Sequence, residues 1–248
     1  MSSSASTSTS QWIAELVRAF PFPDPRDSDP RGLLAYGGDL KAERLLAAYA
    51  QGVFPWYDED PILWFSPDPR SVLRPAEIHV SHSLAKRERA APFSMTMDLA
   101  FEAVIRACSE VPRPGQAGTW ITDDMIEAYI GLHELGFAHS VEAWETREGR
   151  DRELVGGLYG VSLGRAFFGE SMFATADDAS KIAFSAFVRQ LGRWDFDFVD
   201  CQIKTDHLTR FGAAAWNRVD FLEALSTTLG FETRRGRWAF DKPVRAGP

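Results

Sequence analysis

The sequence predicts an α+β fold, with a mixed, mainly antiparallel sheet that is flanked by helices. The first observation is a helical pattern of apolar residues that stops at Gly136, and the second is a set of three strand patterns directly after it. The third is another helical pattern, which leads into one more strand at Phe196. A strand that follows a helical crossover returns beside the same sheet, and this makes the sheet mixed.

Three segments of different composition predict the domain organisation. Residues 1–19 begin with a run of serine and threonine and lack the apolar region of a signal peptide, so we expect a disordered or loosely ordered tail. Residues 20–78 are interrupted by proline and glycine and are rich in large aromatics. We expect them to form a small irregular N-terminal domain with one helix, from Leu40 to about Gln51. Residues 79–248 form the second domain, which contains the α+β pattern.

Capping residues and apolar spacing predict the elements of the second domain. A basic stretch predicts a short helix, and a further helix is expected from Met97 to Ala107. Thr122 is the N-cap of the next helix, and Gly136 ends it. The three strands and the crossover helix are predicted for the stretches AHSVEAWE, ELVGGLYGVSL, RAFFGES and DDASKIAFSAFVRQLG.

Charge and cysteine content limit the classes of function. The net charge is −8, so the chain lacks the broad basic surface that binds a long nucleic acid, and any RNA contact must be local. Cys108 and Cys201 are the only cysteines, which fits a reducing compartment. No apolar run approaches the roughly 20 residues of a membrane helix, and no Cys/His spacing indicates a metal. We therefore expect a cytoplasmic protein with no membrane contact, no metal and no cofactor.

The segment FDFVDCQIK, from Phe196 to Lys204, has the aromatic and β-branched residues of a buried strand but contains two polar side chains, Asp200 and Gln202. On a strand these two side chains point to the same face, and Cys201 between them points to the other. A negative charge and a carbonyl acceptor at one position suit an ammonium or amine group. The alternative is that both residues only satisfy buried backbone groups.

Eight short strings in this order carry a resemblance to a known family: FPWY, WFSPDPRSVL, GTWIT, LHELGFAHSVEAWE, LVGGLYGV, FFGESMF, ASK and DCQI. From Gly32 to about Leu225 the chain resembles the leucyl/phenylalanyl-tRNA protein transferases. The resemblance implies a small N-terminal domain followed by a domain like the GNAT acetyltransferases. It also implies transfer of leucine or phenylalanine, with methionine as a further donor, from aminoacyl-tRNA to the α-amine of proteins that begin with Arg or Lys. These proteins are thereby marked for degradation in the N-degron pathway.

The resemblance also implies the reaction centre. The α-amine of the acceptor attacks the ester of the aminoacyl-tRNA, which requires positioning and a proton acceptor more than a strong base. Asp200 and Gln202 are the expected catalytic residues. Gln202 orients the amine and Asp200 or water takes the proton, because an amide oxygen is a poor proton acceptor. Glu170, which follows Gly169, is expected to bind the N-terminal Arg or Lys together with Asp200, and a carboxylate that faces water is the alternative.

Five apolar residues are the expected contacts of the aminoacyl-tRNA donor. Leu158, Met172 and Phe173 are expected to form the walls of the pocket for its leucine or phenylalanine side chain. Trp56 and Trp120 match the positions at which the family holds the terminal adenosine of tRNA, where stacking contributes about 1–3 kcal/mol per base. Ordinary core packing is the competing interpretation for all five residues.

A basic cluster of Lys86, Arg87 and Arg89 is expected to contact the phosphate backbone of tRNA. The chain has His82 where the family pattern has an arginine, and a solvated helix face is the alternative for this cluster. His207 follows the strand that contains Asp200, but a lone histidine beside an acid at a helix start is more often structural. We therefore do not assign His207 to the catalytic residues.

Two other classes of function share some of these features. A GNAT-type N-acetyltransferase would use acetyl-CoA, but it needs a glycine-rich turn for the pyrophosphate, and the stretch ESMFATADDASK has two aspartates there instead. A non-catalytic adaptor for basic N-termini would use Glu170 and Asp200 equally well, but it leaves the tryptophans unexplained. We expect an enzyme that acts as a monomer, with aminoacyl-tRNA and proteins with N-terminal Arg or Lys as its partners.

Overall fold

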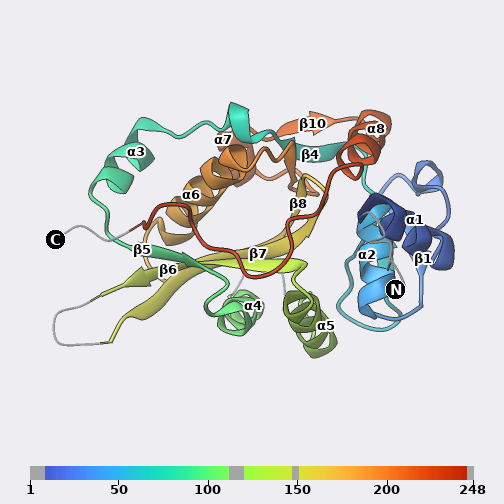
Figure 1. Ribbon diagram of the computed structural model, residues 1–248, viewed down its shortest axis with the longest axis horizontal. Helices are drawn as coiled ribbons and strands as arrows, with labels where there is room; N and C mark the ends of the chain where they lie inside the picture. Colours follow the sequence, from blue (N-terminus) through green and yellow to red (C-terminus); the bar gives the residue numbers. More distant parts are fainter. Residues whose placement is uncertain (1–8, 112–119, 147–150, 245–248) are drawn as a thin grey trace, which may run out of the picture.

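The computed structural model describes residues 9–111, 120–146 and 151–244, which form a three-stranded and a seven-stranded sheet (Figure 1). The strand orders are β1-β3-β2 in the small sheet and β10-β4-β9-β8-β7-β6-β5 in the large one. The strands are β1 (Leu33–Tyr36), β2 (Phe54–Pro55), β3 (Leu63–Phe65), β4 (Arg70–Leu73), β5 (Ser94–Met97), β6 (Ala138–Glu145), β7 (Glu153–Leu163), β8 (Ala166–Ala174), β9 (Phe198–Asp200) and β10 (Ala214–Trp216). The α-helices are α1 (Thr9–Ala19), α2 (Ala42–Ala50), α3 (His82–Arg89), α4 (Phe101–Glu110), α5 (Asp123–Glu134), α6 (Ala179–Arg193), α7 (Asp206–Arg210) and α8 (Arg218–Thr228), with 3-10 turns η1 (Pro25–Asp27) and η2 (Pro75–Glu77).

The large sheet is mixed, which confirms the α+β prediction. Strands β6, β7 and β8 pair in antiparallel order, and β9 returns parallel to β8 after the helical crossover through α6. Figure 1 shows α6 on one face of the sheet, α4 and α5 on the other, and the N-terminal helices α1 and α2 beside one end. The three central strands lie where the alternating patterns predict them.

Buried apolar side chains fill both faces of the large sheet. Phe168 and Phe173 belong to the core on the side of α4 and α5, whereas Phe167 and Phe187 belong to the core on the side of α6. Neighbouring residues of β8 thus point into different cores, as expected for a strand that is covered on both faces. None of the described helices has the length and apolar content that crossing a lipid bilayer requires.

Helix α5 begins and ends at the residues that the sequence predicts. The hydroxyl oxygen of Thr122 accepts a hydrogen bond from the backbone N–H of Met125 at 3.3 Å, which satisfies one of the free donors at the helix start. Gly136 follows the last turn with φ of +79°, a conformation that glycine adopts without steric cost.

The structure differs from the sequence-based expectations at three places. Residues 1–8 of the expected tail lie outside the described residues, but residues 9–19 form α1, which buries Ile13 and Leu16 in the same core as Phe168. Met97 ends strand β5, so the following helix begins later, at Phe101. Strand β4 falls within the predicted N-terminal domain, yet it pairs with β9 and β10 of the large sheet. Isolated four-residue runs lack the period that would reveal such strands.

A β-bulge interrupts the pairing of β7 with β8. Tyr159 pairs with Ser171 and the next residue, Gly160, pairs with Gly169, so Glu170 is an extra residue without a partner in the register. A bulge bends the strand and redirects the side chain of the extra residue. The Gly160–Gly169 pair therefore determines where the carboxyl group of Glu170 points.

We predict that Gly160→Ala destabilises the protein by about 3 kcal/mol, because overpacking a buried site has a cost of this order. A Cβ atom on Gly160 would lie 2.1 Å from the carbonyl oxygen of Phe168 and 2.7 Å from the ring of Phe167. Gly131→Ala in α5 is the matched control, since nothing lies within 4 Å of its Cβ position. The control should be neutral or stabilising by up to about 1 kcal/mol. Denaturant unfolding measures both, and equal effects would contradict the close packing at the bulge.

Candidate active site

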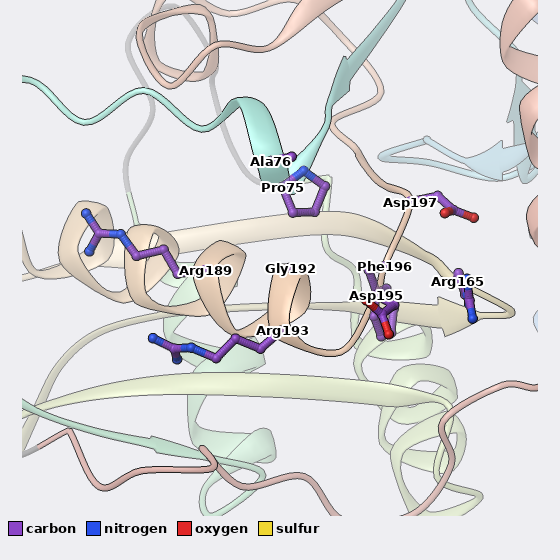
Figure 2. Close-up of a pocket in the computed structure, with 9 residues that line it drawn as sticks. All are labelled: Pro75, Ala76, Arg165, Arg189, Gly192, Arg193, Asp195, Phe196 and Asp197. Atoms are coloured by element: carbon purple, nitrogen blue, oxygen red, sulfur yellow. The ribbon is translucent and has the colours of Figure 1, made fainter.

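Two cavities of the described residues differ in chemical character. One, of about 510 Å³, is lined by charges of both signs from Arg165, Arg189, Arg193, Asp195 and Asp197. Figure 2 shows Arg189 and Arg193 projecting from α6, with Arg165 and Asp197 at the other end. The second cavity, of about 700 Å³, is lined mainly by apolar and aromatic side chains with a few polar groups among them. That composition is typical of a substrate site, so we take the second cavity, called the central cavity below, as the candidate active site.

The central cavity lies where the N-terminal region meets the large sheet. Phe54 and Trp56 contribute one wall, Leu158 and Met172 of β7 and β8 contribute another, and the segment from Val199 to Leu208 contributes a third. Three parts of the chain that are far apart in sequence therefore meet around one space. Such a junction permits a ligand with chemically different parts to be held at several points.

Gln202 and Glu170 bring polar groups to this apolar wall. Both residues line the cavity, each is 8% exposed, and the amide nitrogen of Gln202 donates to Oε1 of Glu170 at 2.8 Å. Gln202 has φ of +58°, the left-handed region that non-glycine residues rarely adopt. Strained backbone of this kind is frequent at functional sites, where the surrounding contacts enforce it.

The expected alternation of side chains along residues 200–202 is wrong. Strand β9 ends at Asp200, and the left-handed backbone of Gln202 breaks the period of two. As a result Val199, Cys201 and Gln202 line the central cavity, and Asp200 does not. Burial raises the pKa of the Cys201 thiol well above its usual range, and the charge of Asp200 raises it further. The thiol is therefore a neutral part of the wall.

Asp200 is held by Arg70 rather than turned toward the cavity. Nε and Nη2 of Arg70 donate to the two carboxylate oxygens of Asp200 at 2.8 and 2.6 Å, and the two side chains are 1% and 0% exposed. Oδ1 of Asp200 also accepts the backbone N–H of Gln202 at 2.9 Å. The expectation that Asp200 contacts a cationic N-terminus directly does not fit this geometry, because its charge is already neutralised and inaccessible.

Glu170 is the carboxylate that reaches the cavity. Its oxygens accept hydrogen bonds from the hydroxyl groups of Tyr49 at 2.8 Å and Tyr129 at 3.2 Å, and the two hydroxyl groups also contact each other. The pKa of Glu170 is raised to about 7. Burial is the largest cause, the hydrogen bonds from Tyr49, Tyr129 and Gln202 act against the rise, and the charge of Asp200 adds to it. Burial, followed by the charge of Glu170, raises the pKa values of Tyr49 and Tyr129 well above 10, so both stay neutral hydrogen-bond donors.

Four of the five expected donor contacts line the central cavity. Trp56, Trp120, Leu158 and Met172 are among its lining residues, whereas Phe173 is not. Phe173 is 3% exposed and belongs to the core on the opposite face of β8, because it follows Met172 on the same strand. Sequence reasoning missed further apolar walls, which come from separate elements and carry no local signal: Phe54, Phe167, Phe184 and Val199.

The expected basic cluster is exposed on α3 and takes no part in lining the cavity. Lys86, Arg87 and Arg89 point to solvent, while Leu84 on the same helix is buried. His207, in contrast, does line the cavity. Burial lowers its pKa, and the nearby charges of Lys181 and Arg210 lower it further, so its imidazole is neutral at physiological pH.

We predict that Arg70→Met destabilises the protein by about 3–5 kcal/mol, because it leaves Asp200 buried without a counter-charge. The matched control is Arg106→Met, since Arg106 pairs with Glu102 at 2.8 Å but the two side chains are 50% and 60% exposed. The control should change the free energy of unfolding by less than about 1 kcal/mol. Denaturant unfolding of both variants is the measurement, and a cost of less than about 1 kcal/mol for Arg70→Met would contradict the described role.

We also predict a pH-dependent effect of Glu170→Gln on stability. The folded state raises the pKa of Glu170 from 4.5 to about 7, so ionisation is less favourable in the folded than in the unfolded chain. This carboxyl group therefore lowers the free energy of unfolding progressively from about pH 4.5 to 7, by about 3 kcal/mol in total, and no further above that pH. A glutamine cannot ionise, so the variant does not lose this stability. Its free energy of unfolding should therefore rise relative to that of the parent from about pH 4.5 to pH 7. Glu127→Gln, the same exchange on the exposed side of α5 and outside the cavity, is the control.

The family profile described as leucyl/phenylalanyl-tRNA protein transferase matches residues 72–226, and that of the N-terminal domain of the same family matches residues 38–68. A leucyl/phenylalanyl-tRNA–protein transferase of Myxococcus xanthus is 59% identical over 218 residues, which cover 88% of this chain and 91% of that protein. A protein of the same name from an Anaeromyxobacter species is 57% identical over 238 residues, which cover 94% and 99% of the two chains. With its cavity at the junction of the two matched regions, the chain belongs to the leucyl/phenylalanyl-tRNA protein transferase family.

Proposed function

We propose that the protein transfers leucine or phenylalanine from aminoacyl-tRNA to the α-amine of proteins that begin with Arg or Lys. The observation that carries this proposal is the composition of the central cavity. It combines an apolar compartment, two tryptophans, and a carboxylate next to a carboxamide. These three parts match the side chain of the donor, the terminal base of the tRNA, and the amino end of the acceptor. As in the family, the acceptor would thereby be marked for degradation in the cytoplasm.

The apolar part of the cavity suits the donor. Leu158 and Met172 would contact a leucine or phenylalanine side chain, and the flexible thioether of Met172 would adapt to both shapes. Trp56 and Trp120 line the same space and would hold the terminal adenosine by stacking. Phe173 does not belong to this proposal, because it faces the opposite core.

The polar part of the cavity suits the acceptor. The carboxylate of Glu170 would attract the cationic end of a chain that begins with Arg or Lys, two residues that share a positive charge. The amide nitrogen of Gln202 already donates to Glu170, so its carbonyl oxygen is the atom that would accept a hydrogen bond from the α-amine and orient it. Asp200 would support Gln202 through the backbone N–H that its Oδ1 accepts.

Contact with the tRNA backbone would come from a small area, because the net charge of the chain is −8. Lys86, Arg87 and Arg89 on α3 are exposed and would meet phosphates of the tRNA without reading its sequence. The enzyme would act as a monomer.

An acetyl-CoA-dependent reaction fits the structure less well. Helix α6 begins after Asp177 and Asp178 at the end of β8, and Asp178 itself has φ of +63° at the N-cap position. A pyrophosphate at this helix start would meet negative charge, whereas helix N-termini that bind phosphate offer free N–H groups and glycine.

We predict that the protein with leucyl-tRNA and a peptide beginning with Arg forms a Leu-Arg peptide, detected by mass spectrometry. A peptide with acetylated N-terminus is the control and should give no product, because it lacks the nucleophilic amine. Acetyl-CoA in place of leucyl-tRNA should give no acetylated peptide. Gln202→Ala should lower the rate by about 10²-fold, the order of a lost positioning contact, while the protein remains folded at the assay temperature despite the lost hydrogen bond to Glu170. Peptide binding without any product would favour an adaptor instead.

A further inference from the structure

Three side chains meet behind the wall of the central cavity, each in contact with the other two. Tyr49 of α2 and Tyr129 of α5 donate to the two carboxylate oxygens of Glu170, and their hydroxyl groups contact each other. Both tyrosines are 0% exposed, whereas Glu170 is 8% exposed and lines the cavity. Of the three, Glu170 is therefore the residue that a bound substrate reaches.

The number of hydrogens in this triangle depends on the protonation state of Glu170. Each of the three oxygen–oxygen contacts needs one hydrogen, the two tyrosine hydroxyl groups supply two, and an ionised carboxylate supplies none. A protonated Glu170 supplies the third, so that each member donates once. An ionised Glu170 instead accepts from Tyr49, Tyr129 and Gln202, and the contact between the two tyrosine hydroxyl groups then lacks a hydrogen. Glu170 therefore has hydrogen-bond partners in both protonation states, as a group that exchanges a proton requires.

We propose that Glu170, supported by Tyr49 and Tyr129, is the proton acceptor of the aminolysis step, an inference that rests on the function proposed above. As the nitrogen of the α-amine forms its bond to the ester carbonyl carbon, one of its protons passes to the carboxylate of Glu170. When the bond from this carbon to the ribose oxygen breaks, the same proton passes to that oxygen. Amine and ester thus give amide and ribose hydroxyl, Glu170 returns to its ionised form, and no other reactant takes part.

Other ionisable groups around the cavity are less suited to this role. Both carboxylate oxygens of Asp200 are bound by Arg70, at 2.8 and 2.6 Å. Nε2 of His207 in α7 is buried without a hydrogen-bond partner among the described residues, so this nitrogen is inaccessible to a substrate. Tyr159 of β7 also lines the cavity, but a phenol is a weak proton acceptor at neutral pH.

The electrostatic environment supports the geometric argument. Burial raises the pKa of Glu170 to about 7, and a proton-transfer group works best when its pKa lies near the working pH. The hydrogen bonds from Tyr49 and Tyr129 act in the opposite direction and lower this pKa. Loss of either hydroxyl group therefore moves the pKa of Glu170 to a higher value.

The test measures kcat and KM for leucyl transfer to the Arg peptide from about pH 6 to pH 9. It compares the parent with Tyr49→Phe, Tyr129→Phe and Glu170→Gln. The kcat of the parent should rise with pH, and in both phenylalanine variants this rise should move by about one unit toward alkaline pH, with activity recovered above it. Glu170→Gln should lose about 10²-fold or more in kcat at every pH. A variant that only loosened the packing would lose activity equally at all pH values.

Tyr57→Phe is the matched control, because Tyr57 is 7% exposed and its hydroxyl is hydrogen-bonded to Thr122 rather than to Glu170. Its pH dependence should equal that of the parent. The acceptor amine also titrates near pH 8, but it does so identically in every variant. Should Tyr49→Phe fail to fold, Tyr129→Phe and Glu170→Gln carry the test.

Two results would overturn the inference while leaving the proposed function intact. One is a pH dependence that is the same in the parent and in both phenylalanine variants. The other is a Glu170→Gln variant that keeps kcat and raises only the KM for the peptide, since Glu170 would then bind the acceptor without accepting its proton. Absence of Leu-Arg product from the parent would instead overturn the proposed function and this inference together.

Discussion

The buried ion pair between Arg70 and Asp200 is the interaction on which the arrangement of the site depends. Both charges are removed from water. The cost of this burial is offset because two short hydrogen bonds join the two side chains and both make additional hydrogen bonds to the backbone. Asp200 also accepts the backbone N–H of Gln202, and the carbonyl of Gln202 accepts the backbone N–H of Ser71. These contacts hold Gln202 in its left-handed conformation, so the charge of Asp200 serves to position a neighbour.

The same ion pair joins the two parts of the protein. Nη1 of Arg70 donates to the carbonyl oxygen of Gly52 at 3.1 Å, and its guanidinium lies 4.8 Å from the ring centre of Phe54 and 4.5 Å from that of Phe221. Arg70 therefore connects the N-terminal region, the large sheet and α8. Because Phe54 also lines the central cavity, one buried guanidinium fixes both a wall of the cavity and the end of β9.

The sequence predicts those features that depend on local pattern. The three strand stretches that become β6, β7 and β8 and the cap at Thr122 each lie within a single element, and these predictions are confirmed. The partner of Asp200 could not be predicted in this way, because Arg70 is 130 positions away and no local signal links the two. The backbone conformation of Gln202 and the bulge at Glu170 also depend on tertiary contacts, which explains why the alternation rule placed Cys201 on the wrong side.

Tyr49 of α2 donates to Glu170, so the smaller domain contributes to the surroundings of this carboxyl group as well as to the walls of the cavity. Its helix keeps solvent away from the rear of the carboxyl group, and burial is the largest cause of the raised pKa. In a chimaera, a smaller domain that packed less closely against the sheet would lower the pKa of this carboxyl group, because burial raises it. Exchange of that domain is thus a way to adjust the pH range of an enzyme without altering a single residue of its sheet.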